Sequence, residues 1–215
     1  MLNRRELLKR IYDTAHEDHS LAKFLEPDAI AFRHRFQDGR NLCFGLFDYL
    51  PLSVDRQPDM HEGIAHRVVF DFKEGINPYI CADLLAAAAV DDPLFGFGPD
   101  AVLVPVPAST TEKHEKRFKV FCRALAENLG ITDGFPMLEV VKVRNKEDKR
   151  HPVRLIDSIR LNAPDDILKD RDVLVVDDVY TQGRSFETIS DLMYSAGAKS
   201  VTGLFLARTS TVKDI

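Results

Sequence analysis

Two adjacent carboxylates, Asp177 and Asp178, directly follow a run of four apolar residues, Val173 to Val176. Carboxylate oxygens accept hydrogen bonds from hydroxyl groups, and they also bind hydrated divalent cations. The pair is therefore suited to the two hydroxyls of a sugar or to a magnesium ion. It is not suited to a phosphate group, because like charges repel each other.

The turn that follows the acidic pair has the residue types of a phosphate site. A helix start presents unpaired backbone N–H groups and the positive end of the peptide dipoles. Glycine lets the chain approach a ligand closely, and hydroxyl side chains add hydrogen-bond donors. A phosphate cradle next to a diol-binding pair predicts a sugar phosphate as the ligand. The turn and the helix start consist of Thr181, Gln182, Gly183, Arg184 and Ser185.

The surrounding pattern predicts the elements that position these residues. Four consecutive apolar residues are typical of a central strand of a parallel sheet, which is buried on both faces. After the turn, apolar residues recur at helical spacing, and Gly197 is suited to the C-terminal cap of that helix. A second buried strand, Ala101 to Val106, runs into a polar loop. Ligands of doubly wound sheets bind at the carboxyl ends of strands, so we expect the loops after both strands to be used.

The segment from Val173 to Ser185 resembles the phosphoribosyl pyrophosphate (PRPP) motif of type I phosphoribosyltransferases. That motif is a hydrophobic strand, two aspartates, a three-residue spacer, glycine, any residue, and serine or threonine. The resemblance implies that Asp177 and Asp178 hold the two ribose hydroxyls and that residues 181–185 wrap the phosphate of the sugar. Gln182 stands where threonine is often found, which removes one hydroxyl and leaves the backbone cradle in place.

By the same resemblance, two further segments bind the leaving group. The loop formed by Ala108, Ser109 and Thr110 would give backbone N–H groups and hydroxyls to pyrophosphate. The long basic connection that contains Arg144 and Lys146 and runs on to residue 160 is similar to the mobile loop that closes over the substrate in this family. Arg144 and Lys146 would bring cations to the pyrophosphate. The alternative is a solvated basic loop.

The resemblance implies an enzyme of nucleotide metabolism. It would bind PRPP with Mg²⁺ as cofactor and transfer the phosphoribosyl group to an unidentified nitrogen acceptor, similar to a nucleobase, with release of pyrophosphate. Asp178 is the candidate general base, by position alone. In this family the acceptor is recognised by a hood of variable segments, here expected in the N-terminal region and at the chain end.

A narrower resemblance, to the ComF branch linked to DNA uptake, covers about the last two thirds of the chain. That branch usually begins with a cysteine-rich zinc ribbon, which this chain lacks, and usually carries Arg-Gly-Phe-Asn where Arg117-Phe118-Lys119 stand here. A second hypothesis is therefore that the protein binds PRPP in the same pocket but catalyses no reaction. It would then be a PRPP-sensing regulator or a ComF-like accessory factor in nucleic-acid uptake or metabolism. The segments that carry this resemblance are Phe72-Lys73-Glu74-Gly75, Val104-Pro105-Val106-Pro107, Asp177-Asp178-Val179-Tyr180-Thr181 and Ala207-Arg208-Thr209.

The length of the chain and its element pattern predict an α/β fold. A chain of 215 residues is long enough for one substantial domain with an appended part. We expect a type I phosphoribosyltransferase-like fold, that is, a doubly wound, mostly parallel sheet flanked by helices, with an N-terminal α+β extension. The expected division places the extension or hood in residues 1–63 and the phosphoribosyltransferase core in residues 64–215.

The composition of the chain limits the binding partners and the cell compartment that we expect. A formal net charge of −5 argues against bulk nucleic-acid binding. Cys43, Cys81 and Cys122 are isolated in the sequence and form no disulfide or zinc pattern, so a cytoplasmic protein is expected. The longest clearly apolar run, residues 84–90, is too short to span a membrane. A homodimer is compatible with the resemblance, because dimers are common among such proteins.

Several expectations concern the remaining elements. Alternating apolar clusters and turn residues predict strands or a hairpin within residues 29–52, and residues 53–63 read as a loop. Residues 67–72 are interpreted as a strand or a helix end, and Asn77-Pro78 as the start of the next helix. Residues 139–143 are a further strand candidate, and residues 201–206 are the expected last strand.

Overall fold

The computed structural model describes residues 2–51, 54–144, 153–164 and 166–209. Five α-helices are found in these ranges: α1 Arg4–Glu17, α2 Met60–Lys73, α3 Pro78–Ala89, α4 Thr111–Leu129 and α5 Arg184–Ser195. The strands are β1 His34–Asp38, β2 Asn41–Tyr49, β3 Val102–Pro105, β4 Thr132–Asp133, β5 Leu138–Val140, β6 Ile159–Leu161, β7 Asp172–Tyr180 and β8 Ser200–Thr209. Short 3₁₀ turns occupy Leu21–Phe24, Pro27–Ala29, Phe135–Met137 and Ile156–Ser158.

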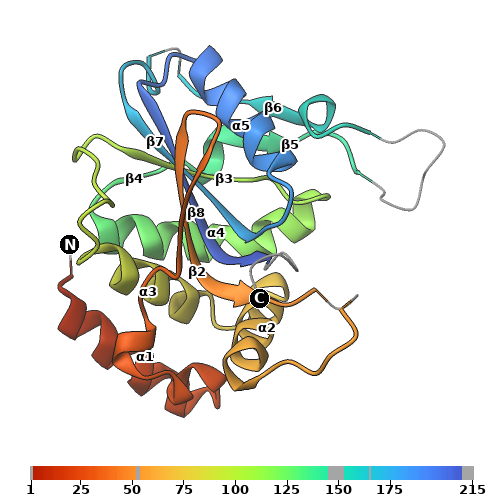
Figure 1. Cartoon of the computed structure of the whole chain (residues 1–215). Helices are drawn as coiled ribbons and strands as arrows, with labels where there is room; N and C mark the ends of the chain where they lie inside the picture. The colour runs from red at the N-terminus through yellow and green to blue at the C-terminus, as the bar shows by residue number, and fades with distance from the viewer. Residues whose placement is uncertain (1, 52–53, 145–152, 165, 210–215) are drawn as a thin grey trace.

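A six-stranded sheet in the order β1-β2-β8-β7-β3-β4 lies at the centre of the molecule (Figure 1). The pairs β2–β8, β8–β7, β7–β3 and β3–β4 are parallel, and only the edge pair β1–β2 among these six strands is antiparallel. From β3 the chain crosses through α4 to β4 at one edge, and from β7 it crosses through α5 to β8 in the opposite direction. The winding therefore reverses between β3 and β7, and the predicted doubly wound, mostly parallel α/β sheet flanked by helices is confirmed.

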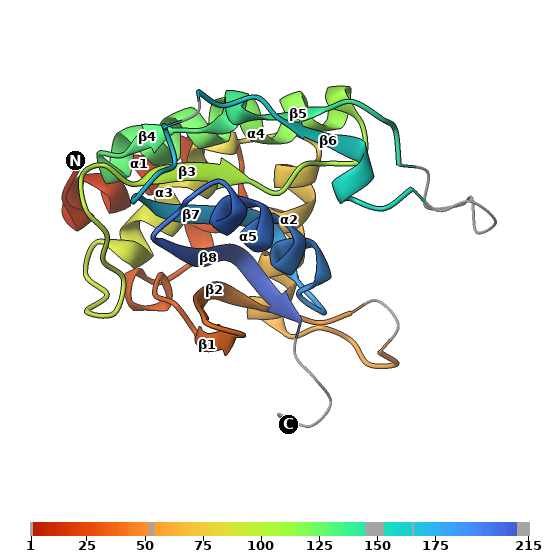
Figure 2. The ribbon, with the colours of Figure 1, turned by 90° about the horizontal axis from the view of Figure 1, so that it is seen from above.

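The helices cover the two faces of the sheet unequally. Figure 1 shows α5 above the sheet and the other four helices below it, and Figure 2 views the molecule from the side of α5. The alternate residues of the central strands follow this division, as parallel strands buried on both faces require. Leu174 and Val176 of β7 belong to the core under α2, α3 and α4, whereas Val173 and Val175 belong to the core under α5.

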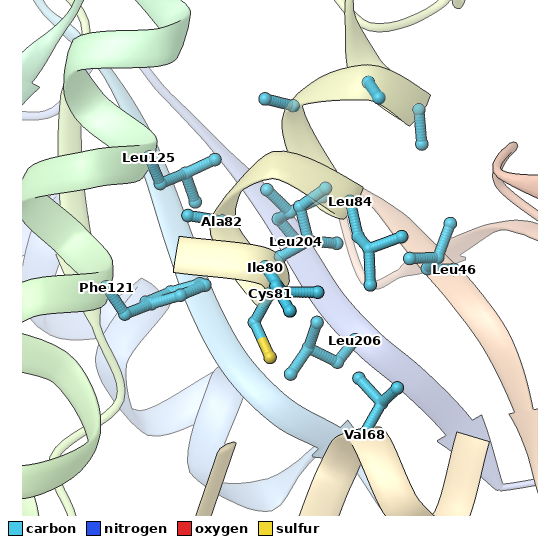
Figure 3. Packing of buried hydrophobic residues seen from close by; sticks show 14 of the residues in the cluster. Leu46, Val68, Ile80, Cys81, Ala82, Leu84, Phe121, Leu125, Leu204 and Leu206 are labelled. Carbon is cyan, nitrogen blue, oxygen red and sulfur yellow. The ribbon is translucent and has the colours of Figure 1, made fainter. Parts of the chain in front are cut away.

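The larger of the two hydrophobic cores surrounds the alanine-rich helix α3. Small side chains let this helix approach the sheet closely, and Cys81 and Leu84 pack with the branched side chains of β2 and β8 (Figure 3). Leu46, Leu204 and Leu206 are the strand residues of this contact, and Phe121 of α4 closes its side. All three cysteines are free and buried.

Three of the helix starts follow the sequence rules for capping. Asn3 and Asp59 begin α1 and α2 with complete capping boxes, and Thr110 accepts the N–H of Lys113 at the start of α4. The start of α5 is different, because Gly183 stands at the cap with φ +74° and has no side chain to accept an N–H. The first-turn N–H groups of α5 are therefore left for another acceptor.

Some expected elements are corrected. For residues 67–72 the helix-end alternative is confirmed and the strand alternative is wrong, because they form the second half of α2. The expected loop over residues 53–63 ends where α2 begins at Met60. The strand candidate over residues 139–143 is shorter, Leu138–Val140, and pairs antiparallel with β6 in a separate two-stranded ribbon. The part of the basic connection near residue 160 is therefore a strand, in which Arg160 lies 3.6 Å from Glu139. The expected hairpin and the expected last strand are confirmed as β1–β2 and β8.

The N-terminal region shares the central sheet. Strand β2 pairs in parallel with β8 over seven residue pairs, and α1 packs on α3. The expected boundary between residues 63 and 64 falls inside α2. Within the described residues, no helix combines the length and the apolar character needed to cross a membrane.

Candidate functional site

The acidic pair lies inside the second half of β7 and not in the loop after it, because β7 continues to Tyr180. Adjacent strand residues point to opposite faces of the sheet. Asp178 faces the helical layer of α2 and α4, and its Oδ2 lies 3.6 Å from Nζ of Lys73 and 3.7 Å from Arg117. The carboxylate of Asp177 accepts the backbone N–H of Asp178 at 2.8 Å. Two neighbouring aspartates thus have different surroundings.

The carboxyl group of Asp177 has a perturbed pKa. Burial removes water from its carboxylate, and the adjacent charge of Asp178 adds repulsion, so the pKa of Asp177 is raised well above its ordinary value. Lys73 and Arg117 act in the opposite direction and do not cancel these effects. A carboxyl group with a raised pKa at the carboxyl edge of a sheet is typical of a functional site.

The predicted phosphate turn surrounds a cavity of about 400 Å³, which we call the turn cavity. Asp177 and Tyr180 belong to its wall beside the turn. Because Gly183 has a positive φ and α5 lacks a side-chain cap, backbone N–H groups at the helix start remain available. The structure brings together here all five residues predicted to wrap a phosphate: Thr181, Gln182, Gly183, Arg184 and Ser185.

A contact with the N-terminal hairpin fixes this turn from outside. The hydroxyl of Tyr180 donates to Oδ2 of Asp38, at the end of β1, over 3.1 Å. A Cβ added at Gly183 would lie 2.6 Å from that hydroxyl and 2.7 Å from that carboxylate oxygen. Burial and the Asp38 carboxylate raise the pKa of Tyr180 to about 12, so the hydroxyl stays protonated and remains a donor.

A second cavity, the strand-end cavity, lies between the carboxyl ends of β3 and β7 and has a volume of about 430 Å³. Asp177 and Ser185 line it as well as the turn cavity. Ala108 and Ser109 of the predicted pyrophosphate loop are also in its wall. The loops that follow two strands thus meet where the winding of the sheet reverses, as expected for a ligand site.

Positive charge dominates the strand-end cavity. Four cationic side chains line it against the two aspartates. Arg144 is half-buried, its guanidinium donates to the carbonyl oxygen of Pro107 at 2.5 Å, and its Nε has no hydrogen-bond partner among the described residues. Burial lowers the pKa of Arg144, and the carboxylate of Asp177 opposes that shift. The four cations are Lys73, Lys113, Arg117 and Arg144.

Lys73 is a site residue that the sequence reasoning missed. Its position depends on the close approach of α2 and α4, where Nε of Arg117 donates to the carbonyl oxygen of Lys73 at 3.1 Å. Gly75 permits this approach, because its φ is +63° and an added Cβ would lie 2.6 Å from the carbonyl oxygen of Lys116. The available signal is the segment Phe72-Lys73-Glu74-Gly75, whose resemblance to the ComF branch assigns no role to the lysine.

Of the predicted substrate-binding residues, Thr110 is not brought to the cavities, and Lys146 lies outside the described residues. The hydroxyl of Thr110 caps α4, and the residue is absent from the described walls of both cavities. The expected role of Lys146 therefore stays a prediction. Further along the same basic connection, Arg154 is exposed and its Nε donates to Oδ2 of Asp157 at 2.7 Å.

The similarity of this chain to known proteins is distant. No family model and no curated protein matches the chain. Among solved structures, two mutants of HPRT (hypoxanthine phosphoribosyltransferase), in which an invariant aspartic acid is replaced by glutamic acid or asparagine, are similar to this chain. Both structures are 13% identical to this chain, with a TM-score of 0.34. Each match covers 66% of this chain, and it covers 79% of the glutamic acid mutant and 77% of the asparagine mutant. A likeness of this degree adds nothing to the assignment of the site, which rests on the geometry of the chain itself.

Proposed function

We propose that this protein is a phosphoribosyltransferase that binds PRPP with Mg²⁺ and transfers the phosphoribosyl group to a nitrogen acceptor. The observation that carries the proposal is the junction of two cavities at Asp177 and Ser185. One cavity has a phosphate-binding turn, and the other is rich in cations. The chemical groups of PRPP follow the same order as these cavities, with a phosphate at one end, a pentose in the middle and a pyrophosphate at the other end.

In the proposed complex each part of PRPP meets matching chemistry. The 5′-phosphate lies on the N–H groups of the turn and on the hydroxyl of Ser185. The ribose hydroxyls donate to Asp177 and Asp178. The pyrophosphate lies in the strand-end cavity, where Lys73, Arg117 and Arg144 neutralise its charge.

The residues present fit a magnesium ion that arrives with the substrate. No group of three or more His, Cys, Asp or Glu side chains in the described part of the chain is arranged to hold a metal by itself. Mg²⁺ is usually bound through one or two carboxylates, several waters and the phosphates of a substrate. Asp177 and Asp178 would supply the carboxylate part, and the ion would neutralise charge on the departing pyrophosphate.

The reaction would break the bond between the anomeric carbon of the ribose and the pyrophosphate oxygen and form a carbon–nitrogen bond to the acceptor. Positive charge develops on the sugar as the pyrophosphate leaves, and the adjacent carboxylates stabilise that charge. Asp178 is proposed as the acceptor of the proton released by the nucleophile, once the ligand has drawn Lys73 and Arg117 away from it. A cytoplasmic setting belongs to the same proposal, because three free cysteines are compatible with a reducing compartment.

The proposal is tested by measuring PRPP–Mg²⁺ binding by calorimetry and pyrophosphate release with a panel of purines, pyrimidines and simple amines. We expect the double variant Asp177→Asn, Asp178→Asn to lose PRPP binding, because both diol acceptors lose their charge. Ser185→Ala should cost about 1.5–3 kcal/mol of PRPP affinity, the value of a charge-assisted hydrogen bond. Ser195→Ala is the matched control, since Ser195 is an exposed serine at the far end of the same helix.

The outcomes separate the candidate functions. Unchanged PRPP affinity in the double aspartate variant would refute the site. Tight PRPP binding without pyrophosphate release for any acceptor would favour the second hypothesis, a PRPP-sensing regulator or an accessory factor in nucleic-acid uptake or metabolism.

A further inference from the structure

A third cavity, which we call the hairpin cavity, has a volume of about 600 Å³ and is larger than the two described above. Its wall combines the hairpin β1–β2, the segment that leads into α2, and the last residues of β8. Figure 2 shows these three parts of the chain meeting on one side of the sheet. None of its described lining residues belongs to the turn cavity or the strand-end cavity, so a molecule bound here would occupy a separate site.

Most charged side chains of this wall are already paired. Glu62 receives two hydrogen bonds from the guanidinium of Arg56, at 2.7 and 2.5 Å, and a third from the backbone N–H of Asp59. The carboxylate of Asp59 in turn accepts the backbone N–H of Glu62 at 2.8 Å. Nε of Arg35 donates to Asp92, which lies outside the described wall, at 2.8 Å. These groups therefore balance one another and leave little charge for a ligand.

The part of the wall formed by β2 and β8 is not balanced in this way. Asp48 accepts a hydrogen bond from the guanidinium of Arg33 at 3.1 Å, and its other carboxylate oxygen lies 3.0 Å from Nε2 of His34. Arg208 is the partner of Asp48 in the β2–β8 ladder. Two arginines and a histidine are thus set against one carboxylate, which leaves an excess of positive charge.

The guanidinium of Arg208 is held in place before any ligand binds. It lies 4.2 Å from the centre of the Phe36 ring, and that ring packs edge-on against Tyr180 with 4.7 Å between the ring centres. Gly45 of β2 keeps the space beside it open, because an added Cβ there would lie 3.3 Å from the Cβ atoms of both Arg208 and His34. A fixed cation loses little conformational freedom when it binds an anion.

Two buried polar atoms of the same wall lack a partner. Oγ1 of Thr209, at the end of β8, and Nδ1 of His61, in the first turn of α2, have no hydrogen-bond partner among the described residues. A hydroxyl can donate a hydrogen bond, and so can Nδ1 of histidine in one of its tautomers. Buried polar atoms of native proteins are nearly always satisfied, so these two atoms indicate a ligand with several acceptor oxygens.

We propose that the hairpin cavity binds the phosphate group of a ligand that is not a substrate of the proposed reaction. The guanidinium of Arg208 would bind two oxygens of the phosphate, and Thr209 and His61 would donate to its remaining lone pairs. A phosphate has acceptor oxygens on several sides, whereas a planar carboxylate has only two. The volume of the cavity also leaves room for a small molecule that carries the phosphate.

Histidine signals in NMR spectra test this site separately from the proposed PRPP site. His34 and His61 line the hairpin cavity, and no described histidine lines the turn cavity or the strand-end cavity. Glycerol 3-phosphate is titrated into the full chain at constant pH and ionic strength, without PRPP. We expect the imidazole signals of His34 and His61 to shift and saturate together, while His16, which is exposed on α1, stays unchanged.

Matched probes define the ligand chemistry. Glycerate, which carries a carboxylate, and uncharged glycerol should both bind at least tenfold more weakly than glycerol 3-phosphate. Inorganic phosphate identifies the source of the phosphate group: equal affinity would assign the site to the free ion, and weaker binding would assign it to a phosphate monoester. Glycerate that binds as tightly as glycerol 3-phosphate, or the absence of a saturable shift of His34 and His61, would overturn the proposal.

Variants assign the binding to the proposed residues. Arg208→Gln should weaken glycerol 3-phosphate binding at least tenfold, whereas Arg5→Gln, which changes an exposed arginine of α1, should leave it unchanged. Thr209→Val removes only a hydroxyl, and we expect severalfold weaker binding with an unchanged melting temperature, so the test stands even where Arg208→Gln fails to fold. Unchanged affinity in Arg208→Gln or in Thr209→Val would contradict the site. Failure to bind PRPP would refute the proposed function and not this site, because the two share no described residue.

Discussion

Asp177 and Asp178 are adjacent in the sequence, and the strand geometry gives them different tasks. Asp178 has cations within 4 Å, whereas Asp177 lines both cavities and has a raised pKa. The residue types were enough to predict an acidic site that binds a diol or a cation. The difference between the two carboxylates depends on Lys73 and Arg117, which come from α2 and α4 and are at least 60 residues away in the chain.

The buried side chain of His114 is expected to make the stability of the fold depend on pH. It is 3% exposed, and its ring stacks on that of Phe135 with 4.9 Å between the ring centres. Burial lowers the pKa of His114 to about 4. Below its unfolded pKa of about 6.5 the unfolded chain binds a proton that the folded chain does not bind, so stability is lost as the pH falls from 6.5 towards 4.

We therefore expect the free energy of unfolding to drop by about 2 kcal/mol more for the wild type than for His114→Phe between pH 7 and pH 5. Phenylalanine keeps the ring contact and cannot take up a proton. Urea unfolding at the two pH values measures the difference, and His16→Gln, which changes an exposed histidine, should behave as the wild type. An equal loss in wild type and His114→Phe would show that His114 does not titrate in this way.

At the scale of elements, the predicted phosphate turn is supported by the end of strand β1, a contact that the sequence pattern did not predict. The hairpin end at Asp38 holds Tyr180 and leaves no room for a side chain at Gly183. The turn, its glycine and its hydroxyls were predictable from residue types and order. The supporting contact was not, because this side-chain hydrogen bond joins residues 142 positions apart.

The variant Gly183→Ala tests this support. The positive φ makes the alanine strained, and the new Cβ would displace either Tyr180 or Asp38. We expect a loss of about 1–2 kcal/mol in the free energy of unfolding, together with at least tenfold weaker PRPP binding. Gly96→Ala is the control, because an added Cβ there meets nothing within 4 Å. Full PRPP affinity in Gly183→Ala would contradict the proposed cradle.

For the whole molecule, the N-terminal helix is tied to the central layers by a buried polar cluster. Asp83 of α3 is 3% exposed and receives hydrogen bonds from Arg10 of α1 and from Asn128 of α4, the latter at 2.7 Å. Arg10 also donates to Oδ1 of Asn128 at 3.0 Å. Three helices thus share one charge that is costly to leave unpaired.

We expect Arg10→Met to lower the free energy of unfolding by about 1–3 kcal/mol, less than a fully buried pair would lose, because Arg10 is partly exposed and Asn128 still binds Asp83. Adding Asp83→Asn should recover part of the loss, and Arg5→Met should cause little change. Urea unfolding followed by circular dichroism and by hydrogen exchange at β8 should show one shared transition. A separate, earlier transition of α1 would instead favour residues 1–63 as an independent part.

The sequence by itself determined the α/β class, the buried central strands and the glycine turn that begins α5, because these follow from local hydrophobic patterns, glycine conformation and helix starts. The tertiary structure decided which cations face Asp178, which strand supports the turn, and that β5 and β6 leave the main sheet. These features depend on contacts between residues far apart in the chain. The pairing of β2 with β8 also brings charged residues from three distant segments, Arg33, Arg56 and Arg208, to the wall of one cavity.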